Sequence, residues 1–271
     1  MLVLKMLILA IVQGVAEFLP IGSSGHLVLL GHWLQLPKSS GTVEIILHAG
    51  TLASILVIYW RRIIDLLAAD RRVIPLLVVG TIPAGVAGVI VKTQFEWILE
   101  SPLLAGSMLL VTGAMLLSLR YLPESQQAYQ ELTYGKVFMI GCFQAFALLP
   151  GISRSGSTIV GGRLGGLKRE DAVTFSFLLA IPAILGATVL KLGDLLGGET
   201  SVIGAVPLAL GAGVAFLVGI LALRWLIAWA REGRLYLFSL WCIPLGLLVI
   251  ALHLLGYLES PPPTTDVIDE V

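Results

Sequence analysis

The sequence predicts an all-α integral membrane protein with an inverted-topology repeat, built from six full transmembrane helices and two re-entrant helix-loop-helix hairpins. Apolar residues make up 57% of the 271 positions and charged residues only 13%, which is a membrane-protein composition. Apolar runs of about 20 residues, the length that crosses a bilayer core, recur along the chain. Two apolar stretches are interrupted by Pro and by a cluster of Gly and Ser.

Each full span is an apolar run bounded by charged residues, Pro or Gly, and its length favours a helix. We expect these helices at 43–60, 74–91, 103–120, 172–190, 203–223 and 235–257. The interrupted stretches lie near 6–35 and 137–162, where each break leaves two half-helices. The N-terminal apolar run is interpreted as part of the fold, because similar runs follow it along the whole chain.

The placement of Lys and Arg tests this topology, since short cytoplasmic loops carry the positive excess. Twelve of these residues fall in four connections, at 61–72, 120–136, 163–169 and 224–234, and four fall on the opposite side. The four connections share one face if both interrupted stretches return to the side from which they enter. Three spans separate these stretches, so one hairpin enters from outside and the other from the cytoplasm.

The two interrupted stretches also resemble each other, which indicates a duplicated unit. The segments "QGVAEFLPIGSSGHLVLLG" (13–31) and "QAFALLPGISRSGSTIVGG" (144–162) share a Gln, a Pro, a Ser-Gly pair and a final Gly at nearly equal spacing. Inverted repeats bring two broken helices together near the membrane interior, so we expect one shared polar site. The expected organisation is one membrane domain over 1–257, with repeats at about 1–120 and 137–257 and an acidic tail at 258–271.

The second break, "LLPGISRSGST" (148–158), has the chemistry of a phosphate site. Gly151 and Gly156 allow the backbone to approach a ligand closely, and Arg154 presents a planar charged fork. The N–H groups that open the next half-helix point to the same place. Tight packing of small residues is the simpler explanation, but packing does not require an intramembrane arginine. The neutral hydroxyl donors in this break are Ser153, Ser155, Ser157 and Thr158.

The first break carries the candidate reactive groups. Glu17 lies four residues after Gln13 on the same helix face, and a Pro ends that helix. A carboxylate, a hydroxyl and an imidazole close together in sequence form a candidate nucleophile with its base and orienting acid. Alternatively, Glu17 is a proton-relay or ion-coupling residue and the imidazole is structural. The groups after Glu17 are Ser23, Ser24 and His26, and the weaker candidates further along are Glu44 and His48.

These motifs carry a family resemblance. The runs "QGVAE" (13–17), "FLPIGSSGH" (18–26) and "PGISRSGST" (150–158) resemble the paired signatures of bacterial undecaprenyl-diphosphate phosphatases of the bacitracin-resistance type. The resemblance covers the chain from near residue 5 to about 255. It implies a hydrolase of the bacterial plasma membrane that removes the terminal phosphate of the polyprenyl carrier diphosphate and regenerates the monophosphate for peptidoglycan synthesis.

The resemblance also implies residue roles. Glu17 and His26 match the catalytic acid and base positions, Ser23 the nucleophile and Arg154 the phosphate-binding arginine. Ser23 attack and water activated by His26 both stay open. The family implies Mg²⁺ or Ca²⁺, but Gln13 replaces the first acidic residue, so Glu17 is the only candidate ligand in this motif and the cation site is not located. The expected substrate-binding residues are Gln13, Ser24, Gly151, Ser153, Ser155, Gly156 and Thr158.

Other functions fit parts of the pattern. A transporter or flippase for a phosphorylated lipid or anion would use the same broken-helix architecture. A phosphatase of the phosphatidic-acid type needs a second histidine after its Ser-Arg pair, and none follows Arg154 within the motif length.

The expected partners are a polyprenyl diphosphate and membrane lipid, a homodimer is left open, and a net charge of zero gives no indication of nucleic acid. The site should open to the outer face, where wall assembly generates the substrate.

Overall fold

The computed structural model describes residues 2–34, 42–95, 99, 101–196 and 204–258, and the regular structure in these ranges is helical. The only extended pairing in them is an isolated β-bridge between Gln127 and Leu167. The predicted all-α class is therefore confirmed. The acidic tail expected at 258–271 lies outside the described residues beyond Leu258.

The helices follow the predicted apolar stretches closely. Four helical segments of the described chain are long and apolar enough to cross a membrane, at Val73–Val91, Arg169–Val189, Ala205–Arg231 and Leu235–Leu254, so the chain is a multi-pass membrane protein. The elements of the first half are α1 (Leu2–Ala16), α2 (Ser23–Leu34), α3 (Thr42–Ile58), α4 (Trp60–Leu67), α5 (Val73–Gln94) and α6 (Pro102–Ser118). Those of the second are η2 (Tyr129–Glu131), α7 (Tyr134–Phe146), α8 (Arg154–Leu164), α9 (Arg169–Leu196), α10 (Ala205–Arg231), η3 (Leu235–Phe238) and α11 (Ser239–Leu254).

Two details of the helix prediction were wrong. The span expected to end at 223 continues as α10 to Arg231, because Leu226 and Ala230 are buried in the core while Arg224 is exposed. A long arginine side chain can reach a polar boundary without ending its helix. The connection at 61–72 contains the short helix α4, which Leu66 anchors to the core.

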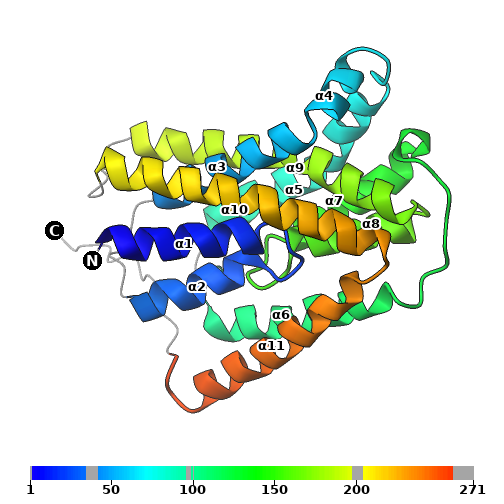
Figure 1. The fold of residues 1–271 in the computed structure, drawn as a ribbon. Helices are drawn as coiled ribbons and strands as arrows, with labels where there is room; N and C mark the ends of the chain where they lie inside the picture. The colour runs from blue at the N-terminus through cyan, green and yellow to red at the C-terminus, as the bar shows by residue number, and fades with distance from the viewer. Residues whose placement is uncertain (1, 35–41, 96–98, 100, 197–203, 259–271) are drawn as a thin grey trace.

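Helices of the first half pack on helices of the second half in matching pairs. α3 packs along α10 and α5 along α9, while α1 packs along α10 and α7 along α5. α6 and α11 lie side by side (Figure 1). We can match α1 with α7, α3 with α9, α5 with α10 and α6 with α11. The contact of α3 with α10 then corresponds to that of α9 with α5, the contact of α1 with α10 corresponds to that of α7 with α5, and the contact of α6 with α11 corresponds to itself. Two interlocked repeats would make this set of contacts.

The core holds the first break in place. Phe18 is completely buried, and its ring centroid lies 5.6 Å from that of Phe177 on α9. Tyr59, after α3, contacts the same ring at 6.1 Å. Ser54 of α3 donates a hydrogen bond to the Phe216 carbonyl of α10 at 2.8 Å, which joins two of the packed helices.

The four connections rich in Lys and Arg contact one another at one end of the bundle. Gln130 donates to Asp70 at 3.0 Å, which joins the connection at 120–136 to the one at 61–72. Arg163 donates to the Pro123 carbonyl at 2.7 Å, which joins the connection at 163–169 to the one at 120–136. The Arg231 side chain, at the end of α10, lies 3.2 Å from Glu170. The positively charged connections therefore share one side of the molecule.

Candidate active site

The first break runs from Glu17 to Gly22, between α1 and α2. Pro20 cannot donate the N–H that a continuing helix needs, and the chain turns at Gly22, whose φ is +79°. The Glu17 N–H still donates to the Gln13 carbonyl at 2.9 Å, so the side chains of these two residues lie on one face. Ser23 is the first residue of α2, and its hydroxyl donates a hydrogen bond to the Glu17 carboxylate on the other side of the turn.

The second break runs from 147 to 153, between α7 and α8. Its turn uses Gly151, whose φ of +93° is a conformation that other residues rarely adopt. Ser153 caps α8 by accepting a hydrogen bond from the Gly156 N–H at 3.1 Å. Arg154 is the first residue of α8, so the cap fixes its position. The predicted division of both interrupted stretches into half-helices is what the structure has.

The two breaks touch each other through glycines. A Cβ on Gly22 would lie 2.8 Å from the Gly151 carbonyl oxygen, and a Cβ on Gly25 would lie 3.2 Å from the Gly151 Cα. The Gly151 N–H also donates to the Ser24 hydroxyl at 3.4 Å. A side chain at Gly22 would clash with the backbone of Gly151, and one at Gly25 would be tight against it, so these glycines let the two motifs meet in one site.

Thr112 of α6 completes the second turn. Its hydroxyl donates to the Gly151 carbonyl at 2.8 Å and accepts from the Ser153 N–H at 3.1 Å. Both bonds are buried, and a neutral hydroxyl can donate and accept at once. Thr112 therefore holds the loop that presents Arg154, although the sequence pattern gave no reason to select it.

Glu17 and Arg154 form a buried ion pair at the centre of the site. The Arg154 Nη2 atom lies 2.5 Å from the Glu17 Oε1 atom, and the two side chains are 17% and 6% exposed respectively. The guanidinium carbon lies 5.9 Å from the Phe177 ring centroid. The other terminal nitrogen, Nη1, is buried and has no hydrogen-bond partner among the described residues. Arg154 therefore has a donor to offer to an anion.

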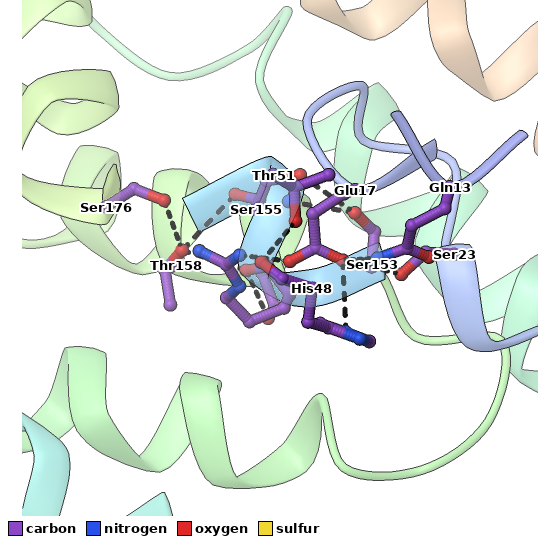
Figure 2. A network of polar contacts seen from close by, with 12 residues as sticks. Gln13, Glu17, Ser23, His48, Thr51, Ser153, Ser155, Thr158 and Ser176 are labelled. Atoms are coloured by element: carbon purple, nitrogen blue, oxygen red, sulfur yellow. Dashed lines mark hydrogen bonds and ion pairs between the residues drawn. The ribbon is translucent and has the colours of Figure 1, made fainter. Parts of the chain in front are cut away.

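The second oxygen of Glu17 faces three further side chains (Figure 2). Oε2 accepts hydrogen bonds from Ser23 Oγ at 3.1 Å and from Gln13 Nε2 at 3.2 Å. The His48 Nε2 atom of α3 lies 3.7 Å from Oε2. Side chains from α1, α2, α3 and α8 therefore surround the single carboxylate of Glu17.

The hydroxyls of the second motif hold α8 in this conformation. The hydroxyl oxygens of Ser153 and Ser155 are 3.2 Å apart and share a hydrogen bond, in addition to the helix cap that Ser153 makes. Thr158 donates to the Arg154 carbonyl at 2.8 Å, and its hydroxyl lies 2.6 Å from that of Ser176 on α9 (Figure 2). Ser157 donates to the Phe143 carbonyl of α7. These bonds brace the helix that begins at Arg154.

His26 makes its hydrogen bonds to groups other than Glu17, unlike the pairing that the sequence suggested. Its Nδ1 donates to the Gly22 carbonyl at 2.7 Å, and its Nε2 accepts from the Trp241 indole N–H at 2.9 Å. In the described part of the chain no hydrogen bond or ion pair joins His26 to Glu17. The turn at Gly22 points this ring toward α11 instead. The imidazole beside Glu17 is that of His48.

His48 was only a weak candidate in the sequence, because nothing local to α3 links it to either break. Its signal was a spacing of four residues from Glu44, whose side chain lies outside the part of the chain that the structure describes. The contact with Glu17 depends on how α3 packs against α1, which a sequence pattern does not show.

The donor set does not fit a resident divalent cation. Mg²⁺ and Ca²⁺ prefer several carboxylate or carbonyl oxygens. Both Glu17 oxygens already accept hydrogen bonds, and the neighbouring position is the amide of Gln13. No group of three His, Cys, Asp or Glu residues among those described could hold a metal ion. The buried Arg154 Nη1 donor, which has no hydrogen-bond partner among the described residues, is suited to an anion instead.

Known proteins are similar to this chain over nearly its whole length. The model of the family described as bacitracin resistance protein BacA matches residues 6–248. A protein of Rhodopirellula baltica named undecaprenyl-diphosphatase is 64% identical over 255 residues, which cover 93% of this chain and 98% of that protein. Relatives with the same name in Desulfatibacillum aliphaticivorans and Halothermothrix orenii are 35% and 36% identical, with at least 91% of this chain and 97% of each relative covered.

Proposed function

The chain belongs to the bacitracin resistance protein BacA family, and from this we infer that it is an undecaprenyl-diphosphatase. It hydrolyses undecaprenyl diphosphate to undecaprenyl phosphate and inorganic phosphate. The reaction recycles the lipid carrier for peptidoglycan synthesis, and members of the family confer resistance to bacitracin. The observation that carries this function is the similarity of nearly the whole chain to proteins of that name.

Arg154 and the start of α8 are the proposed phosphate-binding elements. A guanidinium binds phosphate oxygens through paired N–H groups, and a helix N-terminus favours an anion. The buried Arg154 Nη1 without a partner supports this role. On binding, the guanidinium shares its charge between Glu17 and the diphosphate. The prenyl chain remains in the lipid beside the apolar helices.

Ser23 is the proposed nucleophile, since its hydroxyl already donates to Glu17 Oε2. The Ser23 oxygen attacks the terminal phosphorus in line, and its proton passes to Glu17. The bond from that phosphorus to the bridging oxygen breaks, and undecaprenyl phosphate leaves. Water then hydrolyses the phosphoserine and releases inorganic phosphate. Arg154 stabilises the charge on the transferring group in both steps.

Water activated by His26 is the competing route, and the geometry supports it less. Both ring nitrogens of His26 are engaged, by the Gly22 carbonyl and by Trp241. His26 would have to break the bond with Trp241 before its Nε2 could accept a proton. We therefore assign His26 the role of holding the Gly22 turn that aims Ser23.

We further propose that α3, α5, α6, α9, α10 and α11 are the six spans, and that α1–α2 and α7–α8 are re-entrant hairpins of opposite orientation. The matching contacts of the two halves support repeats at about 1–120 and 137–257. α3 and α6 have 17 residues each, about 26 Å of helix, which is short for a bilayer core of about 30 Å. Their spans would include residues beyond the helix ends.

The proposed orientation puts the connections rich in Lys and Arg in the cytoplasm and opens the site to the outer face of the plasma membrane. The contacts that gather these connections at one end of the bundle support a common side. Ser24 is exposed beside the site and can be replaced by Cys after Cys142 and Cys242 are removed. We expect a membrane-impermeant thiol reagent to label Ser24→Cys in intact cells. Labelling only after the membrane is opened would contradict an outward-facing site.

Phosphate release by the purified protein in detergent tests the enzyme assignment. A detergent micelle has no gradient and no second compartment, so transport alone gives no product. We expect undecaprenyl diphosphate to yield one inorganic phosphate and one undecaprenyl phosphate per turnover. A protein that binds the lipid but releases no phosphate would instead fit the transporter or flippase alternative.

A further inference from the structure

His48 lies beside the reactive centre, and neither the family resemblance nor the motif pattern gave it a role. It belongs to α3, which packs against α1, α9 and α10. Its Nε2 atom is 3.7 Å from Glu17 Oε2, and its side chain is 25% exposed. Figure 2 shows its ring on the side of Glu17 that also faces Ser23.

Glu17 is held unequally on its two oxygens. Oε1 accepts a short, charge-assisted bond from Arg154 at 2.5 Å. Oε2 accepts longer bonds of 3.1 and 3.2 Å from two neutral side chains, Ser23 and Gln13. The strongest interaction therefore acts on the oxygen that does not hold the nucleophile.

Substrate binding would disturb this balance, and this step rests on the proposed function. When Arg154 shares its charge with a diphosphate, its hold on Oε1 weakens or shifts. The carboxylate then needs a second restraint on the Oε2 side to stay directed at the Ser23 hydroxyl. Gln13 lies on the same helical turn as Glu17 and moves with it. His48 is fixed to a different element, α3.

We propose that His48 is a positioning residue for the hydrolysis: its Nε2–H closes on Glu17 Oε2 and keeps the carboxylate directed at Ser23 while Arg154 binds phosphate. The distance of 3.7 Å needs to shorten by less than an ångström to reach hydrogen-bond length, about 2.9 Å. His48 acts through Glu17 and does not touch the lipid.

Four substitutions separate this role from simple packing. The amide nitrogen of glutamine can occupy the position of the histidine Nε2, whereas that of asparagine is one bond shorter. Phenylalanine keeps the ring volume and removes both nitrogens. We expect His48→Ala, His48→Asn and His48→Phe to lower kcat about 10- to 100-fold, because the Glu17 carboxylate is then misaligned with Ser23. KM should stay within about twofold of the value for the unsubstituted protein. We expect His48→Gln to regain kcat to within about threefold of the unsubstituted protein, because it restores the donor.

The experiment measures phosphate release from undecaprenyl diphosphate in detergent, with thermal unfolding to verify that each variant is folded. His253, near the end of α11, provides the matched control, and His253→Ala should leave kcat unchanged. Normal kcat in His48→Phe, a loss in His48→Gln equal to that in His48→Phe, or a change in KM alone would overturn the proposal. Absence of phosphate release by the unsubstituted protein would instead refute the enzyme assignment itself.

Discussion

Arg154 and Glu17 are 137 positions apart in the chain, and their side chains meet at 2.5 Å. Each residue lies at the edge of a different helix break, so this ion pair exists only when the two breaks fold against each other. Replacing one partner of a buried pair leaves an uncompensated charge and typically costs about 3–5 kcal/mol of stability. The pair is therefore both the centre of the site and a link between the two halves of the protein.

Arg154→Ala should abolish most of the hydrolysis. The substitution removes the charge that would stabilise the transferring phosphate, and we expect kcat/KM to fall by at least about 10²–10³-fold. Arg154→Lys should recover little of this loss, because an ammonium group is a single point charge and cannot reach Glu17 and a phosphate together. Phosphate release measures the activity, and a folded protein is verified by its unfolding transition. Near-normal turnover of Arg154→Ala would remove Arg154 from the mechanism.

Glu17 and Arg154 should also behave as one unit. If they act together, adding Glu17→Ala to Arg154→Ala will cost much less activity than Glu17→Ala costs in the unsubstituted protein. The double variant should also unfold at a higher temperature than Glu17→Ala alone, because it no longer buries an unpaired guanidinium. Full additivity of the two activity losses would mean that the residues work independently.

Ser23 and Ser24 are adjacent but should respond very differently to removal of the hydroxyl. Ser23 donates to Glu17, whereas Ser24 is exposed and accepts one long bond from the Gly151 N–H. We expect Ser23→Ala to lose turnover about 10³-fold or more, as for other nucleophiles, and Ser24→Ala to lose about tenfold or less. Acid quenching during turnover should trap phosphate on the unsubstituted protein and on Ser24→Ala. Phosphate on Ser23→Ala, or equal losses in the two variants, would contradict Ser23 attack.

Gly151→Ala should damage the fold as well as the site. The residue has φ of +93°, and an added Cβ would collide with the Ala105 carbonyl of α6. A strained conformation of this kind costs about 1–3 kcal/mol before the clash is added. Gly213→Ala on α10 is the matched control, since among the described residues nothing outside its own stretch of helix lies within 4 Å of the added Cβ. Thermal unfolding should separate the two variants clearly, and equal unfolding temperatures would show that the Gly151 turn can relax.

Local chemistry in the sequence was sufficient to predict the two breaks and their meeting. Pro20 and Pro150 with the nearby glycines marked where the helices end, and the duplicated pattern predicted that Glu17 and Arg154 would face one site. The sequence suggested His26 as the histidine beside Glu17, with a structural imidazole as the alternative, and the structure places His48 there. His26 is nearer in sequence, but the Gly22 turn directs its ring to Trp241, and packing of α3 against α1 brings His48 to the carboxylate instead. Thr112 was missed for the same reason, since its role depends on where α6 crosses the second break.

Gln13 should determine how strongly the reaction depends on a divalent cation. In this chain Gln13 donates an amide hydrogen to Glu17 Oε2 at 3.2 Å, so the position stabilises the carboxylate without a metal ion. Gln13→Glu would replace the donor with a second carboxylate next to the first. Two carboxylates in one buried site repel each other, and they also form a better cation site.

We therefore expect Gln13→Glu to lose turnover in the presence of a chelator and to regain it with Mg²⁺ or Ca²⁺, by at least about tenfold. The unsubstituted protein should respond less to the same treatment. Gln13→Leu removes the donor without adding charge, so it should lower turnover by an amount that cations do not restore. Phosphate release across a cation titration measures all three proteins. If Gln13→Glu and the unsubstituted protein respond equally to the chelator, the cation does not bind through this position, and any dependence must come from the diphosphate itself.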